Sequence, residues 1–251
     1  MKRFFLILMA LTWLACSALA EPLTLGGGIS GVAVWPEGAE ESAATYVYRY
    51  TYPTVEGEDE VSGMINDFYT YLVDDALAFA FPMTAEELEG SDVQAYTTIT
   101  GEVTCNNDDY FSVRVTTESF RGAAVSVVAA GHVFARHGDK AGSAVSLPYM
   151  LGILRADETD QWMQDRQTAK ADDMVRRLVW EVIQEQLAAG EVAYYDDLTY
   201  ETLENVFYPE EDFFLDENGD PVFFLQESMV APQTEGILYF PFTLEELLDE
   251  I

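Results

Sequence analysis

The chain has 251 residues, and 49% of them are hydrophobic, so it can bury a sizeable core and is not disordered throughout. Its 12 basic residues against 45 acidic ones give a formal net charge of −33 at pH 7. Such a surface repels nucleic acid phosphates and anionic lipid headgroups, which excludes nucleic acid as a partner. The same charge attracts basic proteins and divalent cations.

The first twenty residues have the composition of a secretory signal peptide. Lys2 and Arg3 form a basic start, and an apolar run too short to span a bilayer follows. Ala18-Leu19-Ala20 then supplies the small-x-small pattern of a cleavage site. We therefore expect cleavage after Ala20 and a secreted or extracytoplasmic protein with no transmembrane segment in the mature chain. Lipoprotein anchoring at Cys16 is the alternative, but Trp13 and Leu14 suit that modification poorly.

Removal of residues 1–20 leaves Cys105 as the one cysteine, so we expect no internal disulfide. Cys105 lies between strand-forming residues and the turn formed by residues 106–109. We expect a partly buried, inert thiol, because a nucleophile needs a base partner and the sequence identifies none.

In the first half of the chain, residues 21–44 are predicted as a flexible leader with one strand at 31–35. Residues 45–52 are β-branched and aromatic, which predicts a strand that ends before Pro53. Apolar residues at helical spacing predict an amphipathic helix over 58–81, broken by Pro82. Four strands are then predicted at 95–104, 110–117, 123–135 and 144–147, and their short turns favour an antiparallel meander over βαβ units.

The second half begins with a predicted helix over 160–189, capped by Gly190, and a shorter one over 198–206. Residues 213–215 and 222–225 flank Asn218-Gly219, which supplies the positive φ angles of a tight turn and predicts a β-hairpin. A third strand is expected at 237–240, ended by Pro241. The last helix, 244–248, starts from Thr243, which has capping-box spacing to Glu246.

The run Phe213-Phe214-Leu215-Asp216-Glu217-Asn218-Gly219-Asp220-Pro221-Val222-Phe223-Phe224-Leu225, with Ala231-Pro232 and Phe240-Pro241-Phe242 after it, resembles a family signature. Tyr52-Pro53-Thr54-Val55 and Gly131-His132-Val133-Phe134 support the match upstream. The family is the extracytoplasmic domain of the anti-sigma-V factor, a domain of unknown function also found ahead of the catalytic domain of some peptidoglycan deacetylases. The resemblance spans roughly residues 46–248.

The resemblance implies an α+β fold of antiparallel β-sheets with packed α-helices in two lobes. On that basis the chain divides into a signal peptide (1–20), a leader (21–44), an N-terminal lobe (45–150) and a C-terminal lobe (151–251). The resemblance gives no catalytic residues. In the anti-sigma factor the domain receives a signal by binding lysozyme, a basic protein. A cytoplasmic sigma-binding segment and an internal transmembrane helix are not expected here.

No metal or cofactor site is expected. His132 and His137 are five residues apart on a predicted strand, so their side chains would lie on opposite faces, and we expect His132 to be hydrogen-bonded on the sheet. The acidic run from Asp216 to Asp220 has glycine at its fourth position, whereas a calcium-binding EF-hand loop needs it at the sixth. A hairpin turn is the better explanation.

Three groups of carboxylates could supply the acid and base of a glycosidase: Asp172-Asp173, Asp196-Asp197 and Glu210-Glu211-Asp212. The sequence does not place any two of them at a working distance. No nucleophile, Walker or dinucleotide-binding motif is present. A cell-wall polysaccharide hydrolase that uses paired carboxylates is therefore the alternative function.

The leading expectation is a binding or sensing module of the cell envelope that is not an enzyme. Its partner would be a basic, lysozyme-like protein or a peptidoglycan component. The candidate binding surface includes Phe213, Phe223 and Tyr239 around the hairpin, which lie either in the core or at the rim of a contact.

Overall fold

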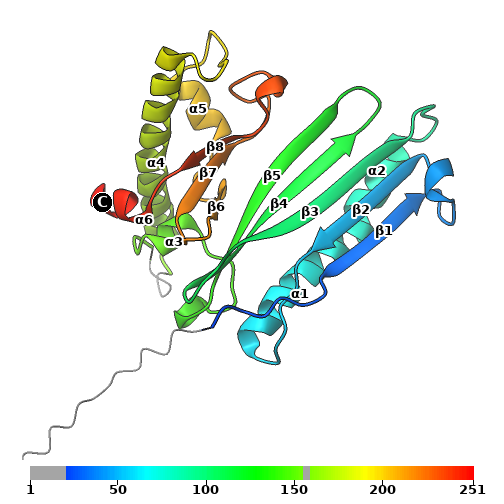
Figure 1. The fold of residues 1–251 in the computed structure, drawn as a ribbon, viewed down its shortest axis with the longest axis horizontal. Coiled ribbons are helices and arrows are strands. Elements are labelled where there is room, and N and C mark those ends of the chain that lie inside the picture. The colour runs from blue at the N-terminus through cyan, green and yellow to red at the C-terminus, as the bar shows by residue number, and fades with distance from the viewer. Residues whose placement is uncertain (1–20, 155–158) are drawn as a thin grey trace, which may run out of the picture.

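A computed structural model describes residues 21–154 and 159–251 of the chain (Figure 1). The predicted signal peptide, residues 1–20 with Cys16, lies outside the described residues. The strands are β1 (Ile29–Trp35), β2 (Tyr46–Tyr52), β3 (Ala95–Asn106), β4 (Tyr110–Phe120), β5 (Val125–Ala135), β6 (Phe213–Leu215), β7 (Pro221–Leu225) and β8 (Leu238–Pro241). The helices are α1 (Glu60–Asp75), α2 (Phe81–Glu87), α3 (Leu147–Met150), α4 (Gln161–Ala189), α5 (Tyr200–Val206) and α6 (Leu244–Asp249).

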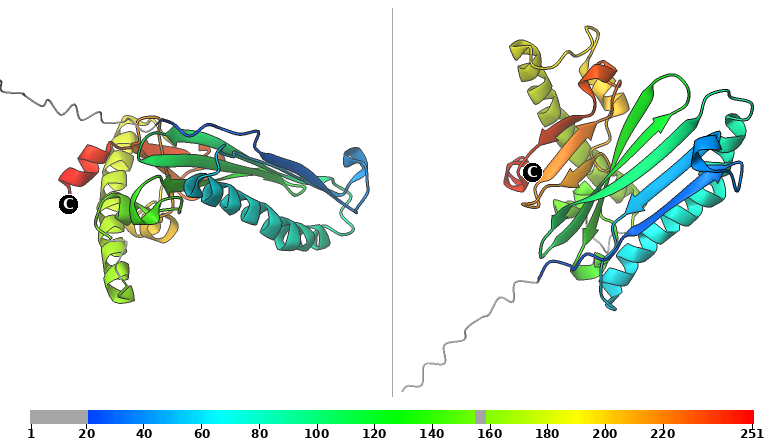
Figure 2. Two further views of the ribbon diagram at one scale, coloured as in Figure 1. Left: turned by 90° about the horizontal axis from the view of Figure 1, so that it is seen from below. Right: turned by 45° about the vertical axis from the view of Figure 1, so that its right-hand side comes forward.

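The fold is α+β, as predicted, and it is built on a sheet of five strands and a sheet of three. The five strands follow chain order, β1 to β5, and β3, β4 and β5 form the expected antiparallel meander. The pair β2 and β3 is parallel, which the sequence analysis missed. Parallel neighbours need a crossover, and α1 and α2 provide it while they cover one face of the sheet (Figure 2).

The first helical segment continues past the point where we expected it to end. Ala76–Ala80 form a π-helical turn, closed by a hydrogen bond from the N–H of Phe81 to the carbonyl of Ala76. Pro82 then lies in the first turn of α2 and does not break the helix, so that prediction was wrong. The first turn of a helix accepts proline because the N–H at that position has no intrahelical partner.

The expected fourth strand of the meander, residues 144–147, was also wrong. Only Ala144 forms an isolated bridge, to Phe134 of β5, and the chain turns into α3 at Leu147. The N–H of Val145 donates to the carbonyl of Val133 at 2.7 Å, so this segment still covers part of the β5 edge.

The predicted leader contributes structure to the N-terminal lobe. Its strand β1 pairs with β2 from Ile29 opposite Tyr52 to Trp35 opposite Tyr46. Upstream, the side chain of Asn106 both donates to and accepts from the backbone of Leu23, at 2.8 Å each. These bonds fix the chain along the sheet from residue 23 onward.

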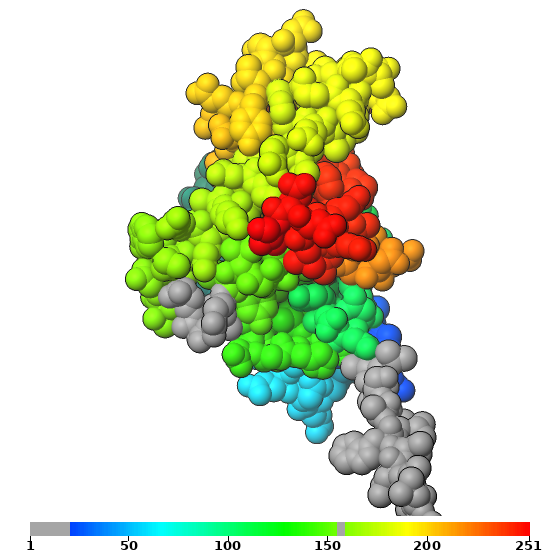
Figure 3. All heavy atoms as spheres, turned by 90° about the vertical axis from the view of Figure 1, so that its left-hand side faces the viewer, coloured from blue at the N-terminus to red at the C-terminus, as the bar shows by residue number. Residues whose placement is uncertain are grey.

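The C-terminal lobe follows the sequence closely. The hairpin β6–β7 is confirmed, with Gly219 at φ 87° and the carboxylate of Asp216 accepting from the N–H of Asp220. The long helix α4 ends at Gly190, whose φ of 69° makes it the predicted left-handed cap. The capping box of Thr243 and Glu246 starts α6, which lies against α4 and β8 at the surface (Figure 3).

One apolar cluster spans both sheets. The apolar cluster around α4 and the three-stranded sheet also takes in Cys105 and Val133 of the five-stranded sheet. Ser112 of β4 is fully buried, and its hydroxyl accepts a hydrogen bond from the N–H of Leu215 at 2.9 Å. The sheet of three strands is thereby fixed against the face of the large sheet that α1 and α2 leave open (Figure 1).

Candidate functional site

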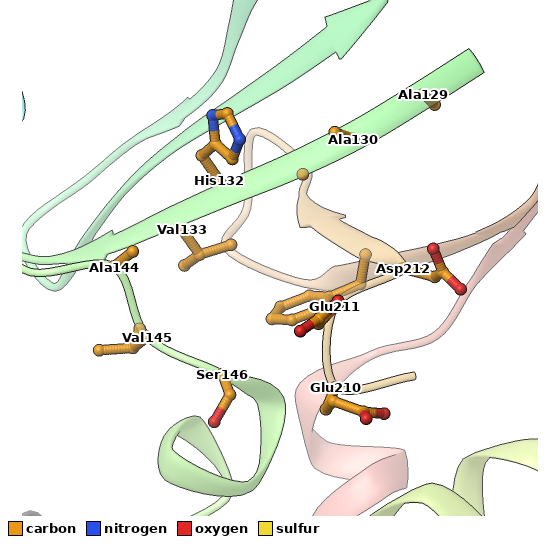
Figure 4. A pocket seen from close by; sticks show the side chains of 12 residues that line it. Ala129, Ala130, His132, Val133, Ala144, Val145, Ser146, Glu210, Glu211 and Asp212 are labelled. Atoms are coloured by element: carbon orange, nitrogen blue, oxygen red, sulfur yellow. The ribbon is translucent and has the colours of Figure 1, made fainter. Parts of the chain in front are cut away.

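A cavity of about 420 Å³ lies where β5, β6 and the segment 144–146 meet (Figure 4). Residues 129–133 form one wall, and residues 210–213, which lead into β6, form another. Each of these strands is the edge of its sheet. Since β6 lies over the face of the large sheet at Ser112 and Gly131, the cavity lies beside this crossing, along the edge of β5.

The outward edge of β5 is covered on both sides of this cavity. Odd-numbered residues of β5 direct their N–H and carbonyl groups away from β4. At Ala129, the side chain of Gln226 accepts from the N–H at 2.9 Å and donates to the carbonyl at 2.8 Å. The N–H of Val127 donates to Glu227, and the returning loop covers Ala135.

Gly131 lies between these covered positions and in the same outward register. Among the described residues, no side chain and no part of the returning loop bonds its N–H or carbonyl, and β6 pairs in register only with β7. A Cβ atom at this position would lie 1.6 Å from the carbonyl oxygen of Phe213. A strand side chain points out of the plane of its sheet, so glycine is required here for the close approach of β6 to the face of β5. Gly131 also lines the cavity.

Three consecutive carboxyl groups line the opposite wall: Glu210, Glu211 and Asp212. Asp212 accepts a hydrogen bond from the N–H of Tyr208 at 2.8 Å, while its burial raises the pKa of its carboxyl to about 6. Glu211 is exposed. Neither lysine nor arginine lines the cavity, so its wall is anionic at neutral pH.

Behind this wall, Glu210 faces the buried carboxyl of Asp172 on α4. Burial, and next the contact with Glu210, raise the pKa of Asp172 well above its usual range, although Arg176 lies 3.6 Å from the other oxygen of Asp172. One buried oxygen of each carboxyl, Oδ1 of Asp172 and Oε2 of Glu210, lacks any other hydrogen-bond partner in the described chain. Asp172 is therefore expected to keep its proton to a higher pH than an ordinary carboxyl does.

His132 contributes no charge to the site. Its ring lies on the far side of β5 from the carboxylates, 4.9 Å from the ring of Phe68 on α1 (Figure 4). Burial lowers its pKa to about 4, so it is neutral at pH 7. We predicted a hydrogen-bonded histidine, but its buried Nδ1 has no partner in the part of the chain that the structure describes.

The predicted surface aromatics separate in the structure. Phe213 and Phe223 belong to the core, at 2% and 0% exposure, whereas Tyr239 is 39% exposed. Tyr239 lies beside Arg114 of β4, whose guanidinium is 5.7 Å from the ring centre. Phe213 still borders the cavity, although its ring is almost fully buried.

Cys105 is buried, and its pKa is raised to about 11 by that burial, which fits the predicted inert thiol. Of the three candidate carboxylate groups, the structure brings Asp172 and Glu210 together, 38 residues apart in sequence. It does not place Asp196 or Asp197 at the cavity. Sequence analysis missed the role of Gly131, although a glycine inside a strand is a signal of close backbone approach.

Within residues 21–154 and 159–251, no three His, Cys, Asp or Glu side chains are grouped to hold a metal ion. The same residues contain no helix with the length and hydropathy of a membrane span.

The fold is similar to that of a solved protein of an uncharacterised domain family, DUF3298. A DUF3298 family protein from Pseudomonas aeruginosa matches over 92% of this chain and 94% of its own, with a TM-score of 0.53 and 10% sequence identity. A DUF3298 member from Bacteroides fragilis covers 90% and 92%, with a TM-score of 0.49 and 14% identity. No family model and no curated protein matches the sequence. At this identity the likeness defines the fold and gives no function.

Proposed function

We propose that the protein is an extracytoplasmic binding module, without catalytic activity of its own, that takes a cationic group of its partner into the cavity between β5 and β6. The observation that carries this proposal is a cavity wall with three carboxyl groups and no basic side chain. The formal charge of −33 extends the same field over the molecule and favours encounter with a basic partner.

Two features of the sequence support an extracytoplasmic location and a basic partner. Residues 1–20 have the pattern of a signal peptide, which would export the chain. The signature around the β6–β7 hairpin resembles the extracytoplasmic domain of the anti-sigma-V factor, in which lysozyme is the bound signal. We therefore propose a basic, lysozyme-like protein, or a cationic component of the envelope, as the partner.

Binding of lysozyme to the mature chain at about 50 mM and 300 mM salt tests the proposal. We expect binding that weakens strongly at the higher salt, because exposed charges are screened beyond a few ångström. Glu211→Gln should weaken the binding at low salt by about fivefold. Glu217→Gln, which makes the same charge change on the hairpin turn away from the cavity, is the matched control. Equal effects of the two variants, or no binding, would count against the proposal.

A hydrolase is the second candidate, and the raised pKa values of Asp172 and Asp212 favour it, since such groups are used in acid–base catalysis. It ranks second because Asp172 is 5% exposed and contacts Glu210 directly, whereas glycosidase carboxyls are separated by about 5 Å or more. Release of acetate or reducing sugar from peptidoglycan by the wild type, and its loss in Glu210→Gln, would establish this candidate instead.

A further inference from the structure

The edge of β5 is covered by three separate devices that together leave one gap. Towards its N-terminal end, the side chains of Gln226 and Glu227 bond the outward groups of Ala129 and Val127. Towards its C-terminal end, the backbone of the returning loop bonds Val133. A free strand edge invites pairing with another chain, and coverage of this kind prevents it. The gap is Gly131, the odd-numbered residue between Val127 and Ala135 at which neither outward group bonds a side chain or a loop of the described chain.

The groups at the gap are those of a peptide-recognition site. Gly131 directs one N–H donor and one carbonyl acceptor outward, the pair with which a strand binds a neighbouring peptide unit. Across the cavity, the exposed carboxylate of Glu211 supplies a negative charge. The distance between the walls is set by the contact of Gly131 with the carbonyl of Phe213, which no larger residue would permit.

We propose that the cavity binds a single peptide unit with a cationic side chain: the backbone of Gly131 pairs with the backbone amide and carbonyl of a lysine or arginine residue, and Glu211 binds its charged side chain. This rests on the proposed function and specifies the ligand class of the same site. Both outward groups of Ala129 and the outward carbonyl of Val133 are already bonded. The ligand therefore pairs with one residue of β5 and does not add a long strand. The volume of about 420 Å³ is within the range of small-ligand sites.

The peptide N-acetyl-Ala-Lys-Ala-amide is a direct probe, and titration followed by NMR or calorimetry measures its affinity for the mature chain. Two analogues separate the contacts. Methylation of the lysine backbone nitrogen removes the donor to the Gly131 carbonyl and should lower the affinity about tenfold, the factor that corresponds to 1.4 kcal/mol for one hydrogen bond. Replacement of lysine by norleucine keeps the stem without the charge and should lower it at least as much.

The amide of Gly131 reports the contact independently. In the free protein we expect its N–H to exchange with solvent faster than the N–H of Ala129, which Gln226 protects. Saturation with the lysine peptide should shift the Gly131 resonance and slow its exchange. A Gly131 amide that is already protected in the free protein would overturn the proposal, because its edge would then be paired internally.

Charge variants separate failure of this inference from failure of the proposed function. Glu211→Gln should weaken the lysine peptide about fivefold and leave the norleucine peptide unchanged, while Glu217→Gln leaves both unchanged. If lysozyme binds in a salt-sensitive way that depends on Glu211 while backbone methylation of the peptide has no effect, the result would support the proposed function and contradict the pairing of a peptide with Gly131. If neither lysozyme nor the lysine peptide binds, both proposals fall.

Discussion

The covered and the open positions along the edge of β5 differ in what each residue finds beside it. The side-chain amide of Gln226 forms the two hydrogen bonds with Ala129 that a neighbouring strand would form. Gly131, two residues further along and with the same backbone direction, instead borders a cavity with carboxyl groups on its opposite wall. The outward backbone groups of Ala129 are thus protected against pairing with another chain. Those of Gly131 are available to a ligand.

The largest effect is expected from Gly131→Ala, because the added methyl group would overlap the carbonyl of Phe213, which belongs to the backbone and cannot rotate away. We expect a loss of about 3 kcal/mol in the free energy of unfolding, measured by urea denaturation. Gly63→Ala in α1 is the matched control, since no atom lies within 4 Å of its added Cβ, and it should leave stability equal or higher by up to about 1 kcal/mol. Similar values for the two would show that β6 is not in close contact with Gly131.

Ser112→Ala should come next. It removes the acceptor for the buried N–H of Leu215 and so weakens the contact between the two sheets, at a cost of about 1–3 kcal/mol. Ser126→Ala, at an exposed position of β5, controls for the loss of a serine hydroxyl and should change stability by less than about 0.5 kcal/mol. A neutral Ser112 variant would mean that β6 is held by its apolar contacts alone.

Asp172 gives a prediction with a sign in pH. Its raised pKa means that the folded protein holds the proton more tightly than the unfolded chain does. Its stabilising contribution is therefore complete below the ordinary carboxyl pKa of about 4 and is lost as the pH rises towards the folded value. The side chain in Asp172→Asn cannot lose a proton. As the pH rises from 4 to 8, the free energy of unfolding of the wild type should therefore fall relative to that of Asp172→Asn by about 1–3 kcal/mol.

Asp173→Asn, with the same change of charge on a side chain that is 72% exposed, is the control for this pH series. Denaturation at four or five pH values measures both variants against the wild type. A difference between Asp172→Asn and the wild type that stays constant with pH would contradict the raised pKa of Asp172.

Gln226→Ala should have the smallest effect on stability, about 1 kcal/mol, because the two hydrogen bonds that it removes from Ala129 are only partly buried. It should speed the hydrogen exchange of Ala129 to the rate of Gly131. Gln233→Ala removes the amide that bonds the carbonyl of Val125 and serves as the control, since it should leave the Ala129 exchange rate unchanged. An unchanged Ala129 rate in Gln226→Ala would show that the coverage does not depend on that side chain.

The parts of the fold that the sequence predicts are those set by local chemistry. Asn218-Gly219 fixes the β6–β7 turn, Gly190 ends α4, and Thr243 with Glu246 starts α6, each through neighbours within a few residues. The parallel pairing of β2 with β3 escaped prediction because a long helical crossover lies between them. Pro82 was misjudged because a π-helical turn places it at a helix start, where its missing N–H has no consequence.

The candidate site could be predicted only in part, for the same reason. The acidic run at 210–212 is visible in the sequence, but its contact with Asp172 arises from packing between segments 38 residues apart. The need for glycine at position 131 could not be predicted from neighbouring residues, because it arises from the contact with β6, about 80 residues later in the chain. Aromatic runs occur both at binding surfaces and in cores, so the sequence alone left both places open for Phe213 and Phe223. The structure places both side chains in the core.

The most direct test of the account is the response of the Gly131 amide to N-acetyl-Ala-Lys-Ala-amide, observed by NMR in the mature protein. The account predicts an amide that is open to exchange in the free protein, that shifts and becomes protected as the peptide saturates, and that fails to respond to the backbone-methylated analogue. A protected amide before addition, or an equal response to the methylated peptide, would contradict it.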